Sequence, residues 1–402
     1  MKRQFIFLPF VAFAIISVII LNAAPTSGKE IRGVSDDIIK VGVILDLTGP
    51  TATIQVEPTT AIRYYFRYLN EQGGVNGRKV KLIVEDDRFS IPAAIAAFKK
   101  LVYRDKVFAI IGTGNTGASV ALLSQFEKEK ILDINPSCSE IFVKPPKRYV
   151  FVFSATYQDG IRLIFSHIIN ELKDPTPKIA FVYSDNEMGK TGRAEARRLA
   201  KVNGFELARE EVLSPGALDA SSQALNLKRS KADYIVMHSY ISNTVALLRD
   251  SKKYGYNPIF FGTQGTCMSD IVKMAGEAAK NFISMHSVAS WYDDNPGIAK
   301  LREVTLRYKP GTEGKHRHRY YTVGWLMCII LHEGMKRAGR NLDGENIIEA
   351  LESIKDLDTN GVSAPITYGP NDRKACDAIK FFKADVDKGL LVPMTGWKKV
   401  AE

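Results

Sequence analysis

Cysteine is scarce in this chain, which has four among 402 residues. They are Cys138, Cys267, Cys328 and Cys376, with no C-x-x-C spacing and no histidine nearby at metal-ligand distance. The usual cysteine-based metal motifs are therefore excluded. An oxidising compartment would allow one disulfide, but the spacing selects no pair. Because no cysteine precedes Cys138, we also expect no lipid-modified amino-terminal cysteine.

Long hydrophobic runs are absent except at the amino terminus, where residues 5–21 are almost wholly apolar. A basic pair precedes this run and small and polar residues follow it, which predicts a secretory signal peptide over residues 1–28. Cleavage after Ala23 or near Gly28 fits the pattern. An uncleaved anchor is the alternative, since a span takes roughly 17–25 residues. We expect export, which places the mature chain in the periplasm of an organism with two membranes.

Acidic residues are outnumbered, with 44 Asp and Glu against 55 Lys and Arg and a formal charge of +11. Such an excess can indicate a nucleic-acid or membrane-surface partner. Here the basic residues are spread along the chain and mixed with acidic ones, which favours a solvated surface and no nucleic-acid partner. His316 and His318 lie in the basic stretch 315–319, where like charges would oppose a cation. We expect a solvated loop there, and no metal site in the chain.

Strands alternate with helices along the chain in two successive series. The first has strands at residues 39–45, 79–85, 107–111, 131–135 and 149–153, with helices at 58–70, 92–103 and 118–129. The second has strands at 178–183, 205–212, 234–238 and 259–261, with helices at 189–202 and 243–254. About 375 mature residues exceed what one core usually supports. The pattern predicts an α/β chain with two doubly wound parallel-sheet lobes.

The loop after the third strand, Gly112–Gly117, fits the G-x-G-x-x-G pattern, with Asp133 where a ribose-binding acid would stand. An NAD-dependent oxidoreductase is therefore the rival interpretation. The fingerprint belongs on the first strand of a dinucleotide-binding domain, however, and an exported chain would have to carry its cofactor across the membrane. We expect no cofactor.

Hydrolase motifs are incomplete. The segment Gly117–Ala121 lacks the second glycine of a nucleophile elbow, and His332–Glu333 has no second histidine at the spacing of a zinc peptidase. No catalytic residue is predicted, and the chain is expected not to be an enzyme.

The same loop offers N–H groups and hydroxyls at the start of a helix, a suitable place for a carboxylate. Ser137 and Ser139, after the fourth strand, add hydroxyls at the same edge of the sheet. Ligands on doubly wound sheets bind beyond the carboxyl ends of the strands. These groups could also serve only as helix caps. Two successive strand-end loops of this content favour a site for a small anion.

Short segments spread along the chain match, in order, those of a known family. They are Ile39–Ile44, Leu47–Pro50, Asn70–Arg78, Glu85–Asp87, Ile110–Gly112, Asn135–Ser137, Tyr183–Asp185 and Phe260–Gly262. Through this series the chain resembles the leucine/isoleucine/valine-binding family of ABC-transporter periplasmic proteins over nearly its whole mature length.

The resemblance implies a type I periplasmic-binding fold with three hinge crossovers, no catalysis, and a monomer that delivers its ligand to permease subunits. A ligand-binding sensor of the same fold is the alternative. The family's pattern divides the chain into two lobes. Lobe one is residues 30–155 plus 289–364, and lobe two is residues 156–288 plus 365–402.

The resemblance also implies ligand positions. The carboxylate-binding loop falls on Asn115, Thr116 and Gly117, with Thr116 supplying a hydroxyl and an N–H. Ser137 would contribute its backbone, and Ser139 replaces a hydroxyl residue that is usually threonine. Tyr240 takes the place of an aromatic residue that closes over the ligand.

Several positions depart from the family's pattern. Gln264 stands where an acid usually pairs with the ammonium of an amino acid, and Ile54 and Met188 replace aromatic residues. A segment that usually contains an aspartate reads here Thr156–Gly160, with Tyr157 in the predicted site. Leaving one member of a buried ion pair unpaired costs about 3–5 kcal/mol.

The departures therefore favour a carboxylate without an ammonium, with an aliphatic or aromatic body. Asp159 or Asp185 could still supply the missing negative charge for an amino acid.

Overall fold

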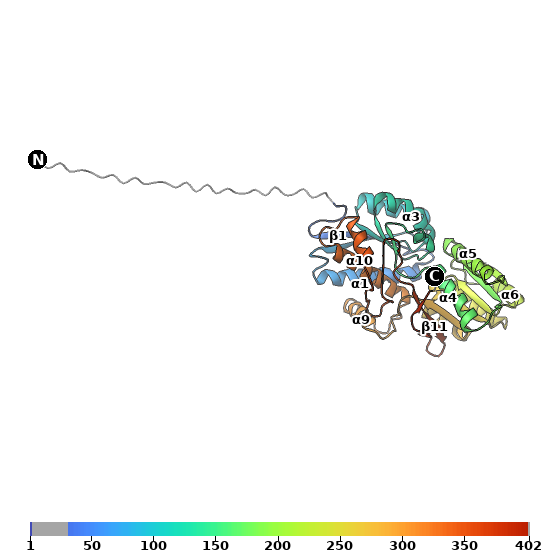
Figure 1. Ribbon diagram of the computed structural model, residues 1–402. Coiled ribbons are helices and arrows are strands. Elements are labelled where there is room, and N and C mark those ends of the chain that lie inside the picture. The colour runs from blue at the N-terminus through green and yellow to red at the C-terminus, as the bar shows by residue number, and fades with distance from the viewer. Residues whose placement is uncertain (2–30, 401–402) are drawn as a thin grey trace. The chain divides into compact units, whose positions relative to one another are not determined.

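Two separate sheets organise the part of the chain that the computed structural model describes, which is residues 31–400 and Met1 (Figure 1). The predicted signal peptide over residues 1–28 lies, apart from Met1, outside the described residues. Within them, no helix combines the length and apolar character needed to cross a membrane.

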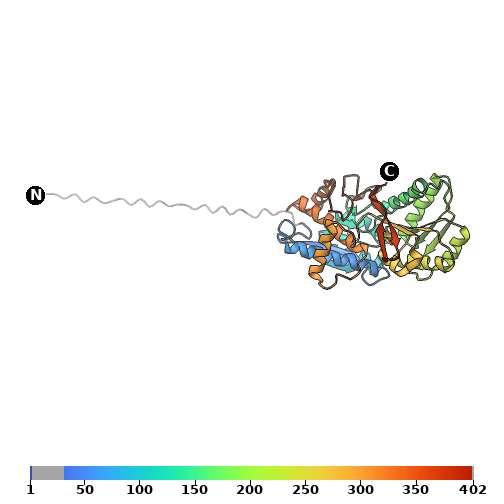
Figure 2. The ribbon, with the colours of Figure 1, turned by 90° about the horizontal axis from the view of Figure 1, so that it is seen from below.

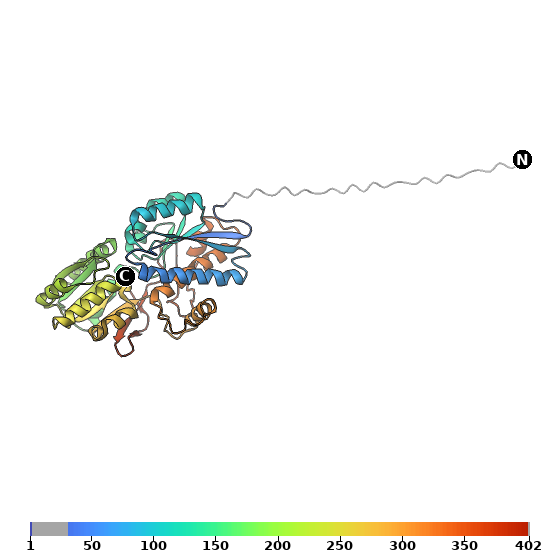
Figure 3. The ribbon, with the colours of Figure 1, turned by 180° about the vertical axis from the view of Figure 1, so that it is seen from behind.

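The first sheet has the strand order β2-β1-β3-β4-β5, and all its strands are parallel. These strands are β1 (Ile38–Leu45), β2 (Lys79–Asp86), β3 (Ala109–Gly112), β4 (Leu132–Asn135) and β5 (Val150–Val152). The accompanying helices are α1 (Ala52–Glu71), α2 (Ile91–Lys99), α3 (Thr116–Glu129), α9 (Pro296–Tyr308), α10 (Arg319–Ala338) and α11 (Asn346–Glu352). Helix α1 packs on α10, and α2 packs on α3, and Figure 3 shows α1 and α3 on opposite faces of the sheet. One apolar core joins all of these elements.

The second sheet has the order β12-β11-β10-β9-β8-β6-β7, with β13 also paired to β11. Its strands are β6 (Ile179–Ser184), β7 (Arg209–Leu213), β8 (Tyr234–His238), β9 (Ile259–Gly262), β10 (Phe282–His286), β11 (Ala378–Asp385), β12 (Leu390–Pro393) and β13 (Lys398–Lys399). Its helices are α4 (Tyr157–Ser166), α5 (Glu187–Val202), α6 (Ser221–Ser230), α7 (Ile241–Lys253) and α8 (Ser269–Ala275). Separate apolar cores lie under α4 and α5 and under α6, α7 and α8. Both sheets therefore repeat one doubly wound order, as the sequence predicts.

The chain passes between the two sheets after β5, after β10 and before β11 (Figure 2). These segments pair with one another, through the bridges Val152–Lys374 and Val288–Ser363. Residues Ile31–Glu402 pack as one unit despite the two sheets. The lobe boundaries expected from the family's pattern stay a prediction. Lobe one is the side of the first sheet, and lobe two is the side of the second sheet.

Some expectations about local structure are wrong. The sequence predicts a helix that begins at Pro58, but α1 begins at Ala52 and contains Pro58 in its interior. A proline there removes one helical hydrogen bond. Helix α10 packs closely at this point, because a Cβ on Gly324 would lie 2.4 Å from the carbonyl oxygen of Pro58.

The basic stretch 315–319 is not a solvated loop. Arg317, His318 and Arg319 are buried. Arg317 lies over the Trp291 ring, and Arg319 donates hydrogen bonds to backbone carbonyls of Cys267 and Val288. Buried cations need such partners, which the sequence pattern does not reveal.

All four cysteines are free and buried. The disulfide that an oxidising compartment would allow is therefore not formed among them in this structure.

Candidate functional site

The loops after β3 and β4 meet at the carboxyl edge of the first sheet. The Ser137 hydroxyl donates to the carbonyl oxygen of Thr113 over 3.1 Å, and the Ser119 hydroxyl lies 2.9 Å from Thr113 Oγ1. Ser137 N–H is also bonded, to Asn135 Oδ1 at 2.7 Å. Two of the predicted anion-binding loops are thus held together by buried hydrogen bonds, with the side chain of Ser137 used for this contact.

Asn115 caps the amino terminus of α3. Its Oδ1 accepts hydrogen bonds from the N–H groups of Gly117, at 3.0 Å, and Ala118, at 3.3 Å, while its Nδ2 donates to the carbonyl oxygen of Phe89. The capping alternative therefore applies to the side chain of Asn115 and to the N–H of Gly117. Both residues remain beside the predicted site, but these particular groups already have partners inside the protein.

Thr116 and Tyr157 face each other from α3 and α4. Burial raises the pKa of the Tyr157 phenol, and the hydrogen bond to Thr116 opposes that shift. The ring of Tyr157 stands edge-on to His238, with centroids 5.2 Å apart. Tyr157 comes from lobe two and Thr116 from lobe one, so this pair spans the space between the sheets.

Tyr240 of lobe two also contacts lobe one. Its hydroxyl accepts a hydrogen bond from Asn186 Nδ2 at 3.0 Å, and its ring stands edge-on to Phe89 of lobe one, with centroids 6.1 Å apart. Burial raises the pKa of Tyr240 to about 12, so the phenol is neutral at any physiological pH and can donate a hydrogen bond.

Ser139 lies at the start of a short 3-10 turn after β4 and is fully buried. Its hydroxyl has no hydrogen-bond partner among the described residues. A buried hydroxyl without a partner is costly, and an incoming acceptor would remove that cost. Of the predicted site residues, Ser139 has the clearest unused hydrogen-bonding capacity.

Gln264 points at the first crossing between the sheets. Its Nε2 donates to the carbonyl oxygen of Thr156 at 3.0 Å, and a Cβ on Gly160 would lie 3.0 Å from its Oε1. That Oε1 is buried and has no partner among the described residues. One end of the amide thus holds the crossing segment, and the other end is available to a donor.

Met188 is buried in the first turn of α5. Its carbonyl oxygen lies 3.1 Å from Nε2 of His238, whose Nδ1 lies 2.7 Å from Thr263 Oγ1. Burial lowers the pKa of His238 to about 4, so the ring is neutral. Since a carbonyl only accepts, Nε2 carries the proton and Nδ1 accepts from the threonine. The carbonyl group of Met188 is therefore held by a hydrogen bond from His238 Nε2, in the tautomer that is protonated at this nitrogen.

A cavity of about 400 Å³ opens between the lobes. It is lined by Pro50, Thr51, Thr53, Ile54, Gly216, Tyr240, Ile241, Ser242, Asp270, Met274 and His318. Of the residues predicted from sequence, Ile54 and Tyr240 lie on its wall. The other predicted site residues do not line this cavity. They lie in or near the loops that follow other strands of the two sheets.

Most residues that line this cavity were not predicted from the sequence. Thr51 follows β1, Gly216 follows β7, and Ile241 follows β8, so the rule that ligands bind beyond strand ends could have found them. His318 had no such signal. Its Nε2 donates to the carbonyl oxygen of Thr53 over 2.9 Å.

Asp270 places a carboxylate on the cavity wall. Burial would raise its pKa, but the hydrogen bond from His316 keeps that pKa below its usual value. The distance between Asp270 Oδ2 and His316 Nε2 is 2.8 Å. This pair joins α8 of lobe two to the loop before α10.

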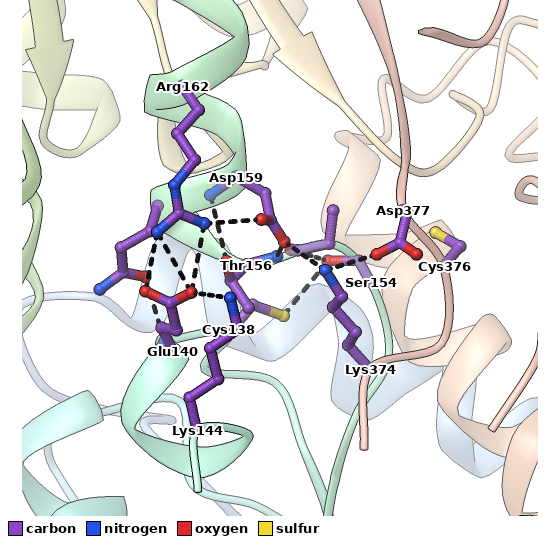
Figure 4. A network of polar contacts seen from close by, with 12 residues as sticks. Cys138, Glu140, Lys144, Ser154, Thr156, Asp159, Arg162, Lys374, Cys376 and Asp377 are labelled. Carbon is purple, nitrogen blue, oxygen red and sulfur yellow. Dashed lines mark hydrogen bonds and ion pairs between the residues drawn. The ribbon is translucent and has the colours of Figure 1, made fainter. Parts of the chain in front are cut away.

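Asp159 is not free to meet a ligand's ammonium. Figure 4 shows its carboxylate between Arg162 and Lys374, at 3.0 and 3.1 Å. Arg162 also contacts Glu140 of lobe one at 3.0 Å. Burial would raise the pKa of Asp159, but Lys374 and the Thr156 hydrogen bonds hold it below its usual value. Asp185, the other acid considered, is exposed.

Comparisons with known proteins identify relatives of this chain. A family model described as periplasmic binding protein matches residues 38–389. The leucine-, isoleucine-, valine-, threonine- and alanine-binding protein of Pseudomonas aeruginosa is 23% identical over 333 residues, covering 82% of this chain and 86% of the relative. Leu/Ile/Val-binding protein homolog 3 of Brucella melitensis is 22% identical over 355 residues, covering 87% of this chain and 92% of the relative.

Solved structures share the fold. A branched chain amino acid ABC transporter protein from Thermus thermophilus with bound valine superposes with a TM-score of 0.84 at 21% identity, covering 92% of this chain and 98% of the other. A fatty acid ABC transporter substrate-binding protein from Thermomonospora curvata gives 0.82 at 22% identity, covering 93% and 96%. The predicted type I periplasmic-binding fold is confirmed.

Proposed function

The chain belongs to the periplasmic binding protein family, and we propose that it captures a small carboxylate between its lobes and delivers it to an ABC transporter permease. The family is one of extracytoplasmic solute-binding proteins, which agrees with the export expected from the sequence. Relatives of this family are named for amino acids and, in one solved structure, for a fatty acid.

The observation that carries the proposal is the buried hydroxyl of Ser139, which has no partner in the described part of the chain. It lies after β4, beside the loop in which Thr116 opens α3. A hydroxyl, an N–H and the positive end of a helix together suit a carboxylate. In our proposal Thr116 and Ser139 donate to the ligand, while Asn115, Gly117 and Ser137 shape the loops around it.

The ligand we favour has no ammonium. Gln264 cannot neutralise a positive charge, and its Nε2 is already bonded to Thr156. Asp159 is neutralised by two cations. Asp270 is the remaining acid on the cavity wall, so an amino acid whose ammonium meets Asp270 is the second candidate.

An apolar ligand body fits the cavity wall. Ile54 enters from α1, and Ile241 and Met274 enter from lobe two, with the neutral phenol of Tyr240 beside them. Met188 lies nearby on α5, where its side chain is buried. Burying such a body contributes roughly 25 cal/mol per Å² of apolar surface. A short aliphatic or aromatic acid matches this environment.

Matched ligand pairs test the proposal. Thermal-shift assays and calorimetry would compare leucine with 4-methylpentanoate and phenylalanine with 3-phenylpropanoate. We expect the deaminated acids to stabilise the protein, by about 2.7 kcal/mol at a hundred times the dissociation constant. Binding of the amino acids alone would contradict the proposed ligand class and favour Asp270 as their partner.

The same assay addresses other functions. Stabilisation by NAD and not by carboxylates would favour the oxidoreductase interpretation of Gly112–Gly117. Delivery is tested by adding the loaded protein to a reconstituted permease and measuring ATP hydrolysis. No stimulation with any permease of this class would favour a sensor. We propose a monomer, which light scattering checks directly.

A further inference from the structure

Three carboxylates converge beneath the loop that follows β1. Asp46 comes directly after β1, Asp86 ends β2, and Asp87 follows it. One oxygen from each of the three carboxylates lies within 4.8 Å of the others. The sequence predicts no metal site, and Glu85–Asp87 stands out there only through its match to the family's pattern.

No Lys, Arg or His pairs with these three carboxylates within the part of the chain that the structure describes. Asp46 instead accepts hydrogen bonds from Thr51, from its N–H at 2.8 Å and its hydroxyl at 2.7 Å. Asp86 accepts from Leu47 N–H at 2.9 Å and from the Thr48 hydroxyl at 2.6 Å. These donors orient the carboxylates without cancelling their charge, in a chain whose formal charge is +11.

The surroundings of Asp87 are a second indication that a cation binds here. It is fully buried, and its Oδ1 accepts from Phe89 N–H at 2.9 Å. Its Oδ2 is buried without any hydrogen-bond partner among the described residues. An unpaired buried charge beside two further carboxylates is strongly unfavourable unless a cation or a proton joins it.

We propose that Asp46, Asp86 and Asp87 bind a hard divalent cation of the calcium class. The available ligands are all oxygens, which calcium and magnesium prefer and which transition metals do not require. Calcium accepts six to eight oxygens in a flexible geometry, whereas magnesium demands a near-ideal octahedron. Extracellular calcium sites with dissociation constants of about 10⁻⁴–10⁻³ M are an appropriate comparison for an exported protein.

The backbone carbonyl of Arg88 lies on the same side of Gly49 as Asp46. A Cβ on Gly49 would stand 2.7 Å from the carbonyl oxygen of Arg88 and 2.7 Å from Asp46 Oδ1. Gly49 N–H donates to Asp46 Oδ1 at 2.5 Å, so this oxygen would share its remaining lone pair with the ion, and the absence of a side chain at Gly49 lets the loop approach both oxygens. Water would supply the remaining ligands, since Asp86 is only partly buried.

The ion would support one wall of the ligand cavity. Asp46 holds Thr51, which lines that cavity, and Asp46 N–H donates to Gln55 Oε1 at 2.9 Å. Gly114, in the loop before α3, packs directly on Gln55, because a Cβ there would lie 2.1 Å from Gln55 Oε1. The cluster is thus connected to both α1 and the loop Gly112–Gly117.

A shared proton is the competing occupant. Burial, with Asp46 and Asp86 nearby, raises the pKa of Asp87 to about 6 when no cation is present. The experiment must therefore detect the ion itself.

Calorimetry with calcium chloride, on the purified protein freed of metals with EDTA, tests the site. We expect one calcium ion per chain, and a dissociation constant at least about tenfold weaker in Asp87→Asn. Asp294→Asn is the matched control, because Asp294 is exposed and lies away from the cluster. Calcium should also raise the melting temperature of the wild type above that in potassium chloride of equal ionic strength.

Two results would overturn the proposal. One is the absence of calcium binding at about 10 mM together with an unchanged melting temperature. The other is calcium binding that persists unchanged in Asp87→Asn. Binding of magnesium without calcium would overturn the calcium class. The melting comparison uses only the wild type, so it remains decisive even where a variant fails to fold.

Discussion

Lys374 Nζ lies 3.1 Å from Asp159 Oδ2, and this contact ties the last crossing between the sheets to the first turn of α4 (Figure 4). Asp159 also forms the capping box of α4 with Thr156. The side chain of Asp159 is 3% exposed and that of Lys374 is 17% exposed, so both are shielded from solvent. The hinge region thus contains a buried polar network rather than a purely apolar contact.

Replacing Lys374 with methionine should destabilise the protein by about 1–3 kcal/mol. Removing one member of a buried pair costs about 3–5 kcal/mol, and Arg162 remains to share the charge of Asp159. Urea unfolding measures the change. Lys388→Met is the control, since the Lys388 side chain is exposed and its pair with Asp385 should contribute little. Equal effects of the two variants would show that burial is unimportant here.

Glu345 should contribute to stability above pH 4.5 and lose that contribution in acid. Hydrogen bonds from Tyr149 and Arg148 lower the pKa of Glu345 from 4.5 to about 2. A carboxyl whose pKa is lower in the folded state stabilises above its unfolded pKa and stops doing so as pH falls through the folded value.

Unfolding of Glu345→Gln between pH 5 and pH 2 should therefore show a shallower acid dependence than the wild type. Glu313→Gln, on an exposed loop, is the control. A wild-type slope in Glu345→Gln would contradict the prediction.

Ser139→Ala should weaken a carboxylate ligand by about 1–3 kcal/mol without reducing stability. The hydroxyl has no hydrogen-bond partner within residues 31–400, so its removal should cost nothing in stability and can even stabilise. Ser137→Ala is the matched control: its hydroxyl bonds to Thr113, so it should lose roughly 1 kcal/mol of stability. Calorimetry and urea unfolding on both variants separate the two roles.

Thr116→Val tests the other donor and should also weaken the ligand by about 1–3 kcal/mol. Wild-type affinity in both Thr116→Val and Ser139→Ala would remove the two residues from the site.

Gln264→Glu should move the ligand preference toward amino acids and reduce stability. A carboxylate attracts an ammonium and repels a nearby carboxylate oxygen. It also replaces the Nε2 donor that now bonds to Thr156, which should cost roughly 1–3 kcal/mol. The measurement is the affinity ratio between an amino acid and its deaminated analogue. An unchanged ratio with reduced stability would leave Gln264 a purely structural role.

Ligand binding should bring the lobes closer. Three segments connect the sheets, and the cavity is lined from both sides, a geometry suited to hinge closure. Small-angle scattering with and without saturating ligand measures the radius of gyration. The same radius in both states would contradict closure.

The local elements of both sheets were predictable because short apolar strands alternate with helices that have clear starts and stops. Val41 and Val43 lie in a largely apolar strand. Asn115 was expected in a binding loop before a helix at 118–129, and it instead caps α3, which begins at Thr116. The doubly wound order followed from that alternation. The strand-end rule also located the loops at Thr116 and Ser139 correctly, since the carboxyl ends of parallel strands share one edge.

Only the tertiary structure decided which distant residues meet. The sequence predicts a helix start at Pro58, but α1 begins at Ala52 and continues through Pro58, where α10 packs closely against it. The stretch 315–319 looked solvated, yet Trp291 covers Arg317, and buried carbonyls accept from Arg319.

Asp46 and Asp87 are 41 positions apart in the chain, so no local pattern relates them. Parallel pairing of β1 with β2 brings their ends to one edge of the sheet, where the carboxylates of the following residues lie close together. A sequence pattern reports the propensity and burial of single segments. The register between strands, and therefore the charges that become neighbours, arises only when the segments pair.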